Sequence, residues 1–391
     1  MTFFAPRDAA RFSAHAFLPD LYRVIVALAL LILLSACAGR PGPDMLNLAQ
    51  ASVPQAKTVT VFVATTRTVG EPGVSAYTDK RAQTMNYASY TVSVPPDHKA
   101  GNIEWPKNGK PDAATSFAVL AQRTLTAKEF YQEVGKHAKA RPNEAADVGV
   151  FVHGFNYNFQ ESLFRVVQMS ADSNVEGVPV LFSWPSQAAL SGYLADKESV
   201  TYSRDYLAEL LTGLTAGRGG TRVMLFGHSM GGWLVTETLR QLKISGRDDV
   251  VDHLNVLLAA PDIDLDVFRQ QMAVIGPLNP PLAIMVSKDD RALQASSLLT
   301  GAGRIGALDI TNPEVQKVAA EEKIVLIDVS GISATNRLNH DRYVQLASLY
   351  PQLTQQRQQD LGSVGGFILD AAAATVSSPF RLVKLVIDPG S

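Results

Sequence analysis

Short, unbroken apolar runs alternate with amphipathic stretches through the middle of the chain, which predicts a regular succession of strands and helices. The apolar runs are too short for typical helices, and they suit strands buried on both faces of a parallel sheet. We expect such strands at 147–152, 178–182, 223–226, 254–259, 282–286 and 324–329. Apolar residues at helical spacing predict helices at 126–139, 159–172, 203–214, 230–242, 267–273, 293–299 and 340–350.

The first part of the sequence has a different pattern. Stretches 58–64 and 88–94 are rich in β-branched residues and predict strands, and 116–122 predicts a third strand at an edge. With the alternation that follows, this favours an α/β fold in which a mostly parallel central sheet carries helices on both faces. We assign this single domain to residues 57–350.

The composition is that of a globular protein. Hydrophobic residues make up 46% and charged residues 18% of the 391 residues, and the formal net charge is −2. Because no cluster of lysine and arginine stands out, a nucleic-acid partner is not expected.

The N-terminus predicts a targeting segment. Arg7, Arg11 and Arg23 precede an unbroken apolar run at 24–34, which is too short to cross a bilayer but suits the core of a signal peptide. We therefore assign residues 1–36 to a signal peptide of the lipoprotein type.

The segment that follows contains Cys37, the one cysteine of the chain, so neither a disulfide nor a Cys₂ metal site is possible. Leu34-Ser-Ala-Cys37 resembles the bacterial lipobox, which implies that Cys37 is lipidated and anchors the protein in the cell envelope. By the same resemblance, Ala38 favours the outer over the inner membrane. An ordinary cleaved signal peptide is the alternative. Residues 37–56 contain several prolines and predict a tether.

The C-terminal extension, 351–391, carries apolar residues at 367–369 and 380–387. We expect this extension to pack on the domain. Contact with a membrane surface is the alternative.

The strongest chemical signal is Gly227-His-Ser-Met-Gly231, which joins the strand at 223–226 to the helix that begins at Met230. A serine between a strand and a helix, flanked by glycines, is typical of the nucleophile elbow of serine hydrolases. Glycines fit because a β-carbon at either flank would collide with the neighbouring element. A tight turn with a solvent-facing serine is the alternative, but we predict that Ser229 is a nucleophile.

A serine nucleophile needs a histidine base and a carboxylate that orients it. In α/β-hydrolases the acid and then the histidine follow the serine along the chain. His253 and His340 are the histidines after Ser229. Because His253 precedes a predicted strand, at the edge opposite the serine, we predict that His340 is the base.

The predicted acid is Asp290, just after the strand at 282–286, with Asp289 as the fallback. Either one could instead cap the next helix. Asp262 and Asp264, which follow the preceding strand, are a weaker alternative for the acid. We expect these two residues to shape their loop and start a helix.

The oxyanion of the reaction needs two N–H donors. One is expected from Met230, which follows the nucleophile. His153-Gly-Phe-Asn156 resembles the His-Gly loop of lipases and esterases, which implies that Phe155 N–H is the second donor. We expect four residues to line the substrate pocket: His153, Asn156, His228 and Trp184. His153 could instead support its loop, and Trp184 could be a buried structural residue.

No cofactor or metal is expected. Gly301-Ala-Gly-Arg-Ile-Gly306 matches the spacing of a dinucleotide-binding loop, but it follows a predicted helix instead of a strand. No metal-ligand spacing such as H-E-x-x-H occurs.

From about residue 59 to 350 the chain resembles the α/β-hydrolase superfamily, and more narrowly its bacterial esterase/lipase-like branch labelled a domain of unknown function. The stretches that carry the resemblance are 64–67, 153–156, 182–186, 227–231, 260–262 and 290–293. The resemblance implies a serine esterase acting on a small-molecule or lipid ester. A thioesterase, amidase or acyltransferase uses the same residues, and a non-enzymatic envelope lipoprotein that uses the fold for binding is a further alternative.

Overall fold

The computed structural model describes residues 40–50, 52–71, 76–139, 148–173, 177–216, 221–345 and 381–382. The predicted signal peptide, the Cys37 lipidation site and almost all of the C-terminal extension lie outside these residues. The residues from Pro43 onward belong to one compact unit.

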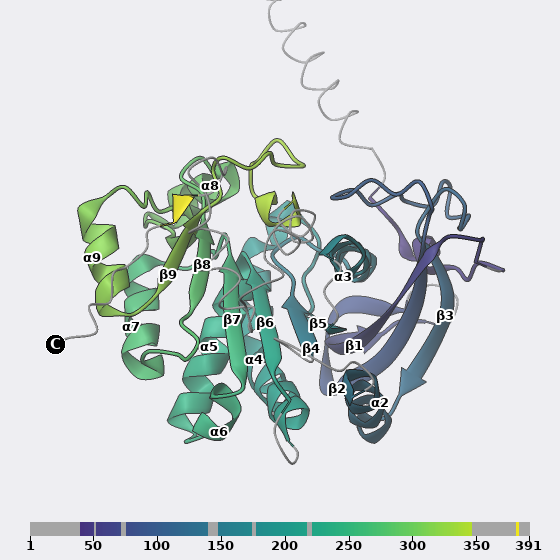
Figure 1. Cartoon of the computed structure of the whole chain (residues 1–391), viewed down its shortest axis with the longest axis horizontal. Coiled ribbons are helices and arrows are strands. Elements are labelled where there is room, and N and C mark those ends of the chain that lie inside the picture. Colours follow the sequence, from purple (N-terminus) through teal and green to yellow (C-terminus); the bar gives the residue numbers. More distant parts are fainter. Residues whose placement is uncertain are drawn as a thin grey trace, which may run out of the picture. The chain divides into compact units, whose positions relative to one another are not determined.

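A ten-stranded sheet organises this unit, in the order β10-β9-β8-β7-β6-β4-β5-β1-β2-β3 (Figure 1). The strands are β1 (Lys57–Val69), β2 (Tyr77–Val94), β3 (Ala118–Leu125), β4 (Val148–Val152), β5 (Val178–Ser183), β6 (Val223–His228), β7 (Leu254–Ala259), β8 (Ala283–Val286), β9 (Val325–Asp328) and β10 (Arg381–Leu382). Adjacent strands in the series β9-β8-β7-β6-β4-β5-β1 pair in parallel. The strands at the two edges of the sheet, β10 on one side and β2 and β3 on the other, pair antiparallel. The mostly parallel sheet of an α/β fold is therefore confirmed.

Helices fill the connections between the strands. They are α2 (Ala127–Lys139), α3 (Phe159–Ser173), α4 (Tyr193–Thr215), α5 (Met230–Ile244), α6 (Asp248–Val251), α7 (Leu265–Ile275), α8 (Arg291–Thr300) and α9 (Pro313–Glu321), with short 3₁₀ turns η1 (Pro43–Leu46), η2 (Leu190–Gly192) and η3 (Ile305–Ala307). Of the helix predicted at 340–350, residues 342–345 are helical, His340 and Asp341 are not, and 346–350 lie outside the described residues. No helix in the described ranges is long and apolar enough to span a bilayer.

Two separate cores lie on the two faces of the sheet. On one face, alternate residues of the strands, such as Val150 and Leu225, pack against α2, α4, α5, α7 and α9. On the other face, Phe151 and Leu181 pack against α3 and against Tyr343 and Val344. Because each central strand contributes to both cores, it appears in the sequence as an unbroken apolar run.

Capping residues fix where several helices begin. At α2, Thr126 Oγ1 accepts a bond from Glu129 N at 3.3 Å, and Glu129 Oε2 accepts one from Thr126 N at 2.8 Å. This reciprocal pair is a capping box. Asp264 caps α7 by accepting bonds from the N–H groups of Asp266 and Val267, which agrees with the loop-shaping role expected for it.

The tether predicted at 37–56 needs correction from Pro43 onward. Leu46 is buried in the core, Leu48 pairs with Val119 of β3, and Ala49 N donates to Val119 O at 2.8 Å. The prolines that suggested an extended linker belong in part to the η1 turn, which docks against the sheet.

Candidate active site

The turn between β6 and α5 holds Ser229 in a strained backbone conformation, with φ 54° and ψ −119°. A β-carbon at Gly227 would lie 2.9 Å from Gly231 O, and one at Gly231 would lie 2.4 Å from the carbonyl oxygens of Val152 and His153. Both glycines are therefore required by close backbone contact. Ser229 N donates to Ala259 O at 2.9 Å, which pins the turn to β7.

His340 and Asp290 meet although they lie 50 residues apart in the sequence. His340 Nδ1 lies 2.7 Å from Asp290 Oδ2. Asp290 is fully buried and also caps α8, because its Oδ1 accepts a bond from Leu293 N at 3.0 Å. The carboxylate therefore orients His340 through one oxygen and caps α8 through the other.

The Asp290 carboxylate also controls the charge of His340. Burial acts to lower the pKa of His340, but the hydrogen bond to Asp290 and the charge of Asp290, together with the charges of Asp262 and Asp341, outweigh burial, and the pKa is raised above its ordinary value. Since Nδ1–H donates to the carboxylate, the neutral ring carries its lone pair on Nε2. That nitrogen is the one available to accept a proton.

His228, which precedes Ser229, supports the His340 loop. Its Nε2 donates to His340 O at 3.2 Å, and the two rings are 4.8 Å apart. Burial, with the nearby charge of His340, holds the pKa of His228 well below its ordinary value, so the ring is neutral. The buried ring packs 4.4 Å from the Tyr343 ring. This position corrects the tentative assignment of His228 to the substrate pocket.

The loop after β4 lies directly against the nucleophile. A β-carbon at Gly154 would stand 3.0 Å from Ser229 Cβ and 2.9 Å from His228 Nδ1. Gly154 therefore allows the backbone of the next peptide, which carries Phe155 N–H, to approach the serine. Asn156 follows with a left-handed φ of 63°, which turns the chain toward α3.

His153 and Trp184 brace this loop from inside the protein. Both are fully buried, their rings stack at 4.8 Å, and Trp184 Nε1 donates to His153 O at 2.8 Å. Burial and the charge of Arg67 lower the pKa of His153 to about 3, so this ring is neutral. Its Nδ1 donates to Gly154 O at 2.9 Å. The bracing role expected for His153 fits this geometry, and neither ring is placed to line an open pocket.

Arg67 is a residue of this region whose role the sequence did not reveal. It is buried, and its guanidinium donates to Ser183 Oγ at 2.9 Å, Tyr157 O at 3.0 Å and Ser186 O at 3.2 Å. These bonds tie β1, the end of β5 and the loop after β4 together. The sequence signal that could have indicated a buried role for Arg67 is its position near the end of a strand rich in apolar residues.

The fallback acids have other partners. Asp289 forms a two-point ion pair with Arg342, which holds the pKa of the Asp289 carboxyl far below its usual range. Asp262 accepts hydrogen bonds from Ser296 Oγ at 2.7 Å and Tyr193 Oη at 2.9 Å, and it forms an ion pair with Arg304, whose Nε lies 3.0 Å from Oδ1. Its backbone N–H donates to Ser229 O at 3.1 Å, so Asp262 shapes the elbow.

Aromatic side chains stand beside the Gly154 loop. The Phe155 ring lies 5.3 Å from the Tyr193 ring, and Lys197 Nζ lies 4.2 Å above the Trp233 ring. Trp233 is on the first turn of α5, just after Ser229. Phe155, Tyr193 and Trp233 are half-buried and pack against the same core, and we call these three aromatic residues the apolar flank.

The glycine-rich stretch at 301–306 follows helix α8 and leads into η3, where Gly306 N donates to Pro261 O at 3.0 Å. It packs against the loop after β7 and opens no βαβ unit. Among the described residues, no group of three or more His, Cys, Asp or Glu is arranged to hold a metal ion.

Residues 126–357 match the family described as "Alpha/beta hydrolase of unknown function (DUF900)". The chain belongs to this family. The match contains the Ser229 turn, Asp290 and His340, and it leaves out β1 to β3. Together with the fold, membership identifies the protein as an α/β hydrolase.

Other comparisons add little. No curated protein gives a significant match to the chain. A solved structure named "Putative hydrolase" from Agrobacterium vitis S4 is 12% identical, covers 75% of this chain and 98% of its own, and has a TM-score of 0.30.

Proposed function

We propose that the protein is a serine hydrolase that cleaves carboxylic esters through an acyl-enzyme intermediate. Ser229 Oγ attacks the ester carbonyl carbon while His340 Nε2 takes the hydroxyl proton. The bond to the alcohol oxygen then breaks, and His340 returns the proton to the departing alcohol. His340 Nε2 next takes a proton from a water molecule that attacks the acyl carbonyl carbon. The bond to Ser229 Oγ breaks, the acid leaves, and His340 returns the proton to Ser229.

Asp290 and the backbone complete this machinery. Asp290 fixes the tautomer of His340 and stabilises the imidazolium that forms in each step. The N–H groups of Met230 and Phe155 bind the oxyanion of each tetrahedral intermediate. Met230 begins α5, where the first N–H groups have no partner inside the helix.

The observation that carries the proposal is the 2.7 Å bond between His340 Nδ1 and Asp290 Oδ2. It supports a base in the loop whose His340 carbonyl accepts a bond from His228, the residue before the strained Ser229 turn. A surface histidine that merely caps a helix would not need a fully buried carboxylate partner.

Two finer parts of the proposal concern substrate and location. The apolar flank of Phe155, Tyr193 and Trp233 favours an ester with an apolar acyl or alcohol group. The lipobox-like sequence at Cys37 supports a lipid-anchored enzyme in the cell envelope, with its domain outside the cytoplasm and the outer membrane as the site.

The test is hydrolysis of p-nitrophenyl esters of graded acyl length, supplied as monomers and as micelles, by the purified protein and by Ser229→Ala. We expect turnover that Ser229→Ala lowers by roughly 10⁴-fold or more. Matched thioesters and amides define the preferred bond. Absence of turnover on every substrate would favour a protein that uses the fold for binding.

A further inference from the structure

Two neighbouring carboxylates on one loop meet two basic residues on another. Asp290 binds His340, and Asp289 binds Arg342 through Oδ1–Nη1 at 2.5 Å and Oδ2–Nη2 at 2.8 Å. The fork of an arginine matches a carboxylate at two points, which fixes direction as well as distance. The loops that carry the acid and the histidine are therefore joined twice.

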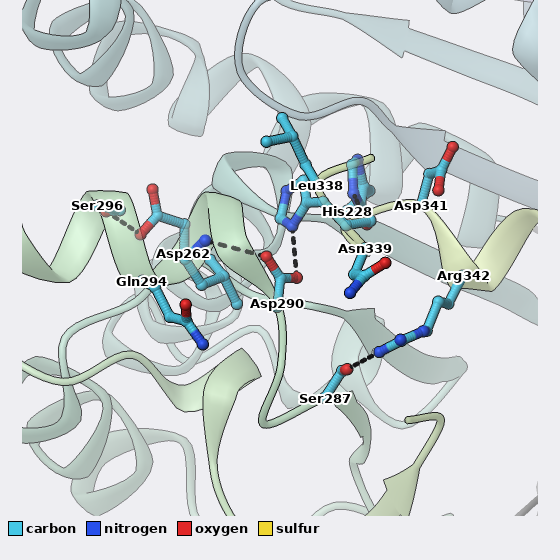
Figure 2. A network of polar contacts seen from close by, with 12 residues as sticks. His228, Asp262, Ser287, Asp290, Gln294, Ser296, Leu338, Asn339, Asp341 and Arg342 are labelled. Carbon is cyan, nitrogen blue, oxygen red and sulfur yellow. Dashed lines mark hydrogen bonds and ion pairs between the residues drawn. The ribbon is translucent and has the colours of Figure 1, made fainter. Parts of the chain in front are cut away.

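Arg342 is the centre of this second junction. Its side chain is buried, Nη1 also donates to Ser287 Oγ (Figure 2), and Nε donates to Ile332 O at 2.8 Å. Ser287 Oγ in turn donates to Asp289 Oδ1 at 2.7 Å. One guanidinium thus holds the end of β8, the loop after β9 and the residue next to the acid.

Further hydrogen bonds join the loop of Asp289 to the loop of His340. Asn339 Nδ2 donates to Asp289 Oδ2 at 3.1 Å, and Arg291 N donates to Leu338 O at 2.9 Å. Asn339 itself has a left-handed φ of 59°, directly before His340. The backbone turn that presents His340 is therefore fixed from the side of Asp289 and Arg291.

The histidine loop needs such support because it is irregular from Val329 to Asp341. Asp341 organises the loop internally by accepting bonds from Thr335 N at 3.0 Å and Asn336 N at 3.3 Å. These internal bonds shape the loop but do not set its distance from Asp290. A shift of about 1 Å in a reacting group can lower a rate by about 100-fold.

We propose that Arg342 and Asp289 are positioning residues, forming with Ser287 a clasp that holds His340 in register with Asp290. This inference rests on the proposed function only for its effect on catalysis. Neither residue contacts the serine, and their effect passes through His340.

The charges around His340 define a readout that is specific to its position. The groups that face it are Asp290 at the start of α8, Asp262 after β7, Asp341 on its own loop and His228 on β6. The bond to Asp290 raises the pKa of His340 most among the favourable influences. If His340 moves away from Asp290, its pKa falls and the acid limb of activity moves to lower pH.

The experiment compares Arg342→Met, Arg342→Lys and Asp289→Asn in the full chain. Arg269→Met is the matched control, because it removes an exposed ion pair to Asp266 on α7. We expect Arg342→Met to lower kcat for a p-nitrophenyl ester by about 100-fold, with KM little changed and the acid limb at lower pH. Arg342→Lys should recover part of kcat, and Arg269→Met should match the wild type.

A second readout needs no substrate. In ¹⁵N-histidine-labelled protein, the Nδ1 proton of His340, assigned by its loss in His340→Gln, should be sharp in the wild type and in Arg269→Met, and broadened or lost in Arg342→Met. That result together with no ester turnover by the wild type would keep the clasp and reject the proposed function. A folded Arg342→Met with an unchanged proton signal and acid limb would overturn the clasp.

Discussion

At the scale of single residues, the proposed catalysis depends on the two hydrogen bonds that one buried carboxylate accepts. Asp290 gives one oxygen to the α8 backbone and the other to His340. The neighbouring Asp289 differs from it only by one position in the sequence, yet it faces Arg342. Sequence alone left both open, because the direction of a side chain in a loop depends on contacts with the distant histidine loop.

Replacement of this carboxylate by an amide separates its two roles. Asn is as good an N-cap as Asp, so Asp290→Asn should keep α8 and change the free energy of unfolding by less than about 1 kcal/mol. It should lower kcat by roughly 10⁴-fold, because the amide no longer selects the right tautomer or stabilises the imidazolium.

The pH profile gives the sign of this effect. His340 must be neutral to accept the serine proton, so wild-type activity is lost as pH falls through a pKa that Asp290 holds above its ordinary value. In Asp290→Asn the pKa of His340 drops, and the acid limb of kcat/KM moves to lower pH. A limb that stays in place would mean that Asp290 does not control His340.

At the scale of elements, sequence prediction worked where apolar periodicity decides the structure. The strands from β4 to β9 appear at or close to the predicted positions, since each must be apolar on both faces. The start of α4 was missed because its buried face is built from Asp196, Ser199 and Val200, of which only Val200 is apolar. Asp196 is satisfied there by Ser186 Oγ at 2.6 Å and Gln187 N at 2.8 Å.

Two further misses have different causes. The extensions of β1 and β2 pair with each other through a polar stretch around Arg67, which no apolar pattern indicates. Helix α9 was overlooked although Asn312 and Pro313 are a cap and a first-turn proline.

The contact between the loop after β4 and the elbow can be tested with a single methyl group. At Gly154 an added β-carbon would press on His228 and Ser229, whereas at Gly149 in β4 it would meet nothing within 4 Å. We expect Gly154→Ala to lower kcat by about 10²–10³-fold, as loss of an oxyanion donor does.

Gly149→Ala is the matched control for this change and should stay close to wild type. Rates with a p-nitrophenyl ester, read beside a thermal unfolding curve, separate a local effect from loss of fold. Equal rates for the two variants would argue against a role for the Gly154 loop in catalysis.

At the scale of the whole molecule, parallel topology explains why distant residues meet. Ser229, Asp290 and His340 follow β6, β8 and β9, whose carboxyl ends share one edge of the sheet (Figure 1). This rule led from the sequence to the prediction that Ser229, Asp290 and His340 lie at the same edge. The braces around them were harder to foresee, because Arg67, His228 and Arg342 act through contacts that have no sequence motif.

The proposed anchor is also a property of the whole molecule. Cells expressing the full chain with radiolabelled palmitate should label the wild-type protein and Ser35→Ala, and should leave Cys37→Ala unlabelled and released from the membrane fraction. Ester turnover in detergent should be equal in all three, because the compact unit begins at Pro43. Label on Cys37→Ala, or none on the wild type, would refute the lipoprotein assignment.

The most direct measurement of the central claim is the reaction of the purified protein with a fluorophosphonate, followed by peptide mass spectrometry. We predict one covalent adduct, on Ser229, that forms at least about 100-fold more slowly in His340→Gln. No adduct on folded protein, or an adduct on another serine, would contradict it.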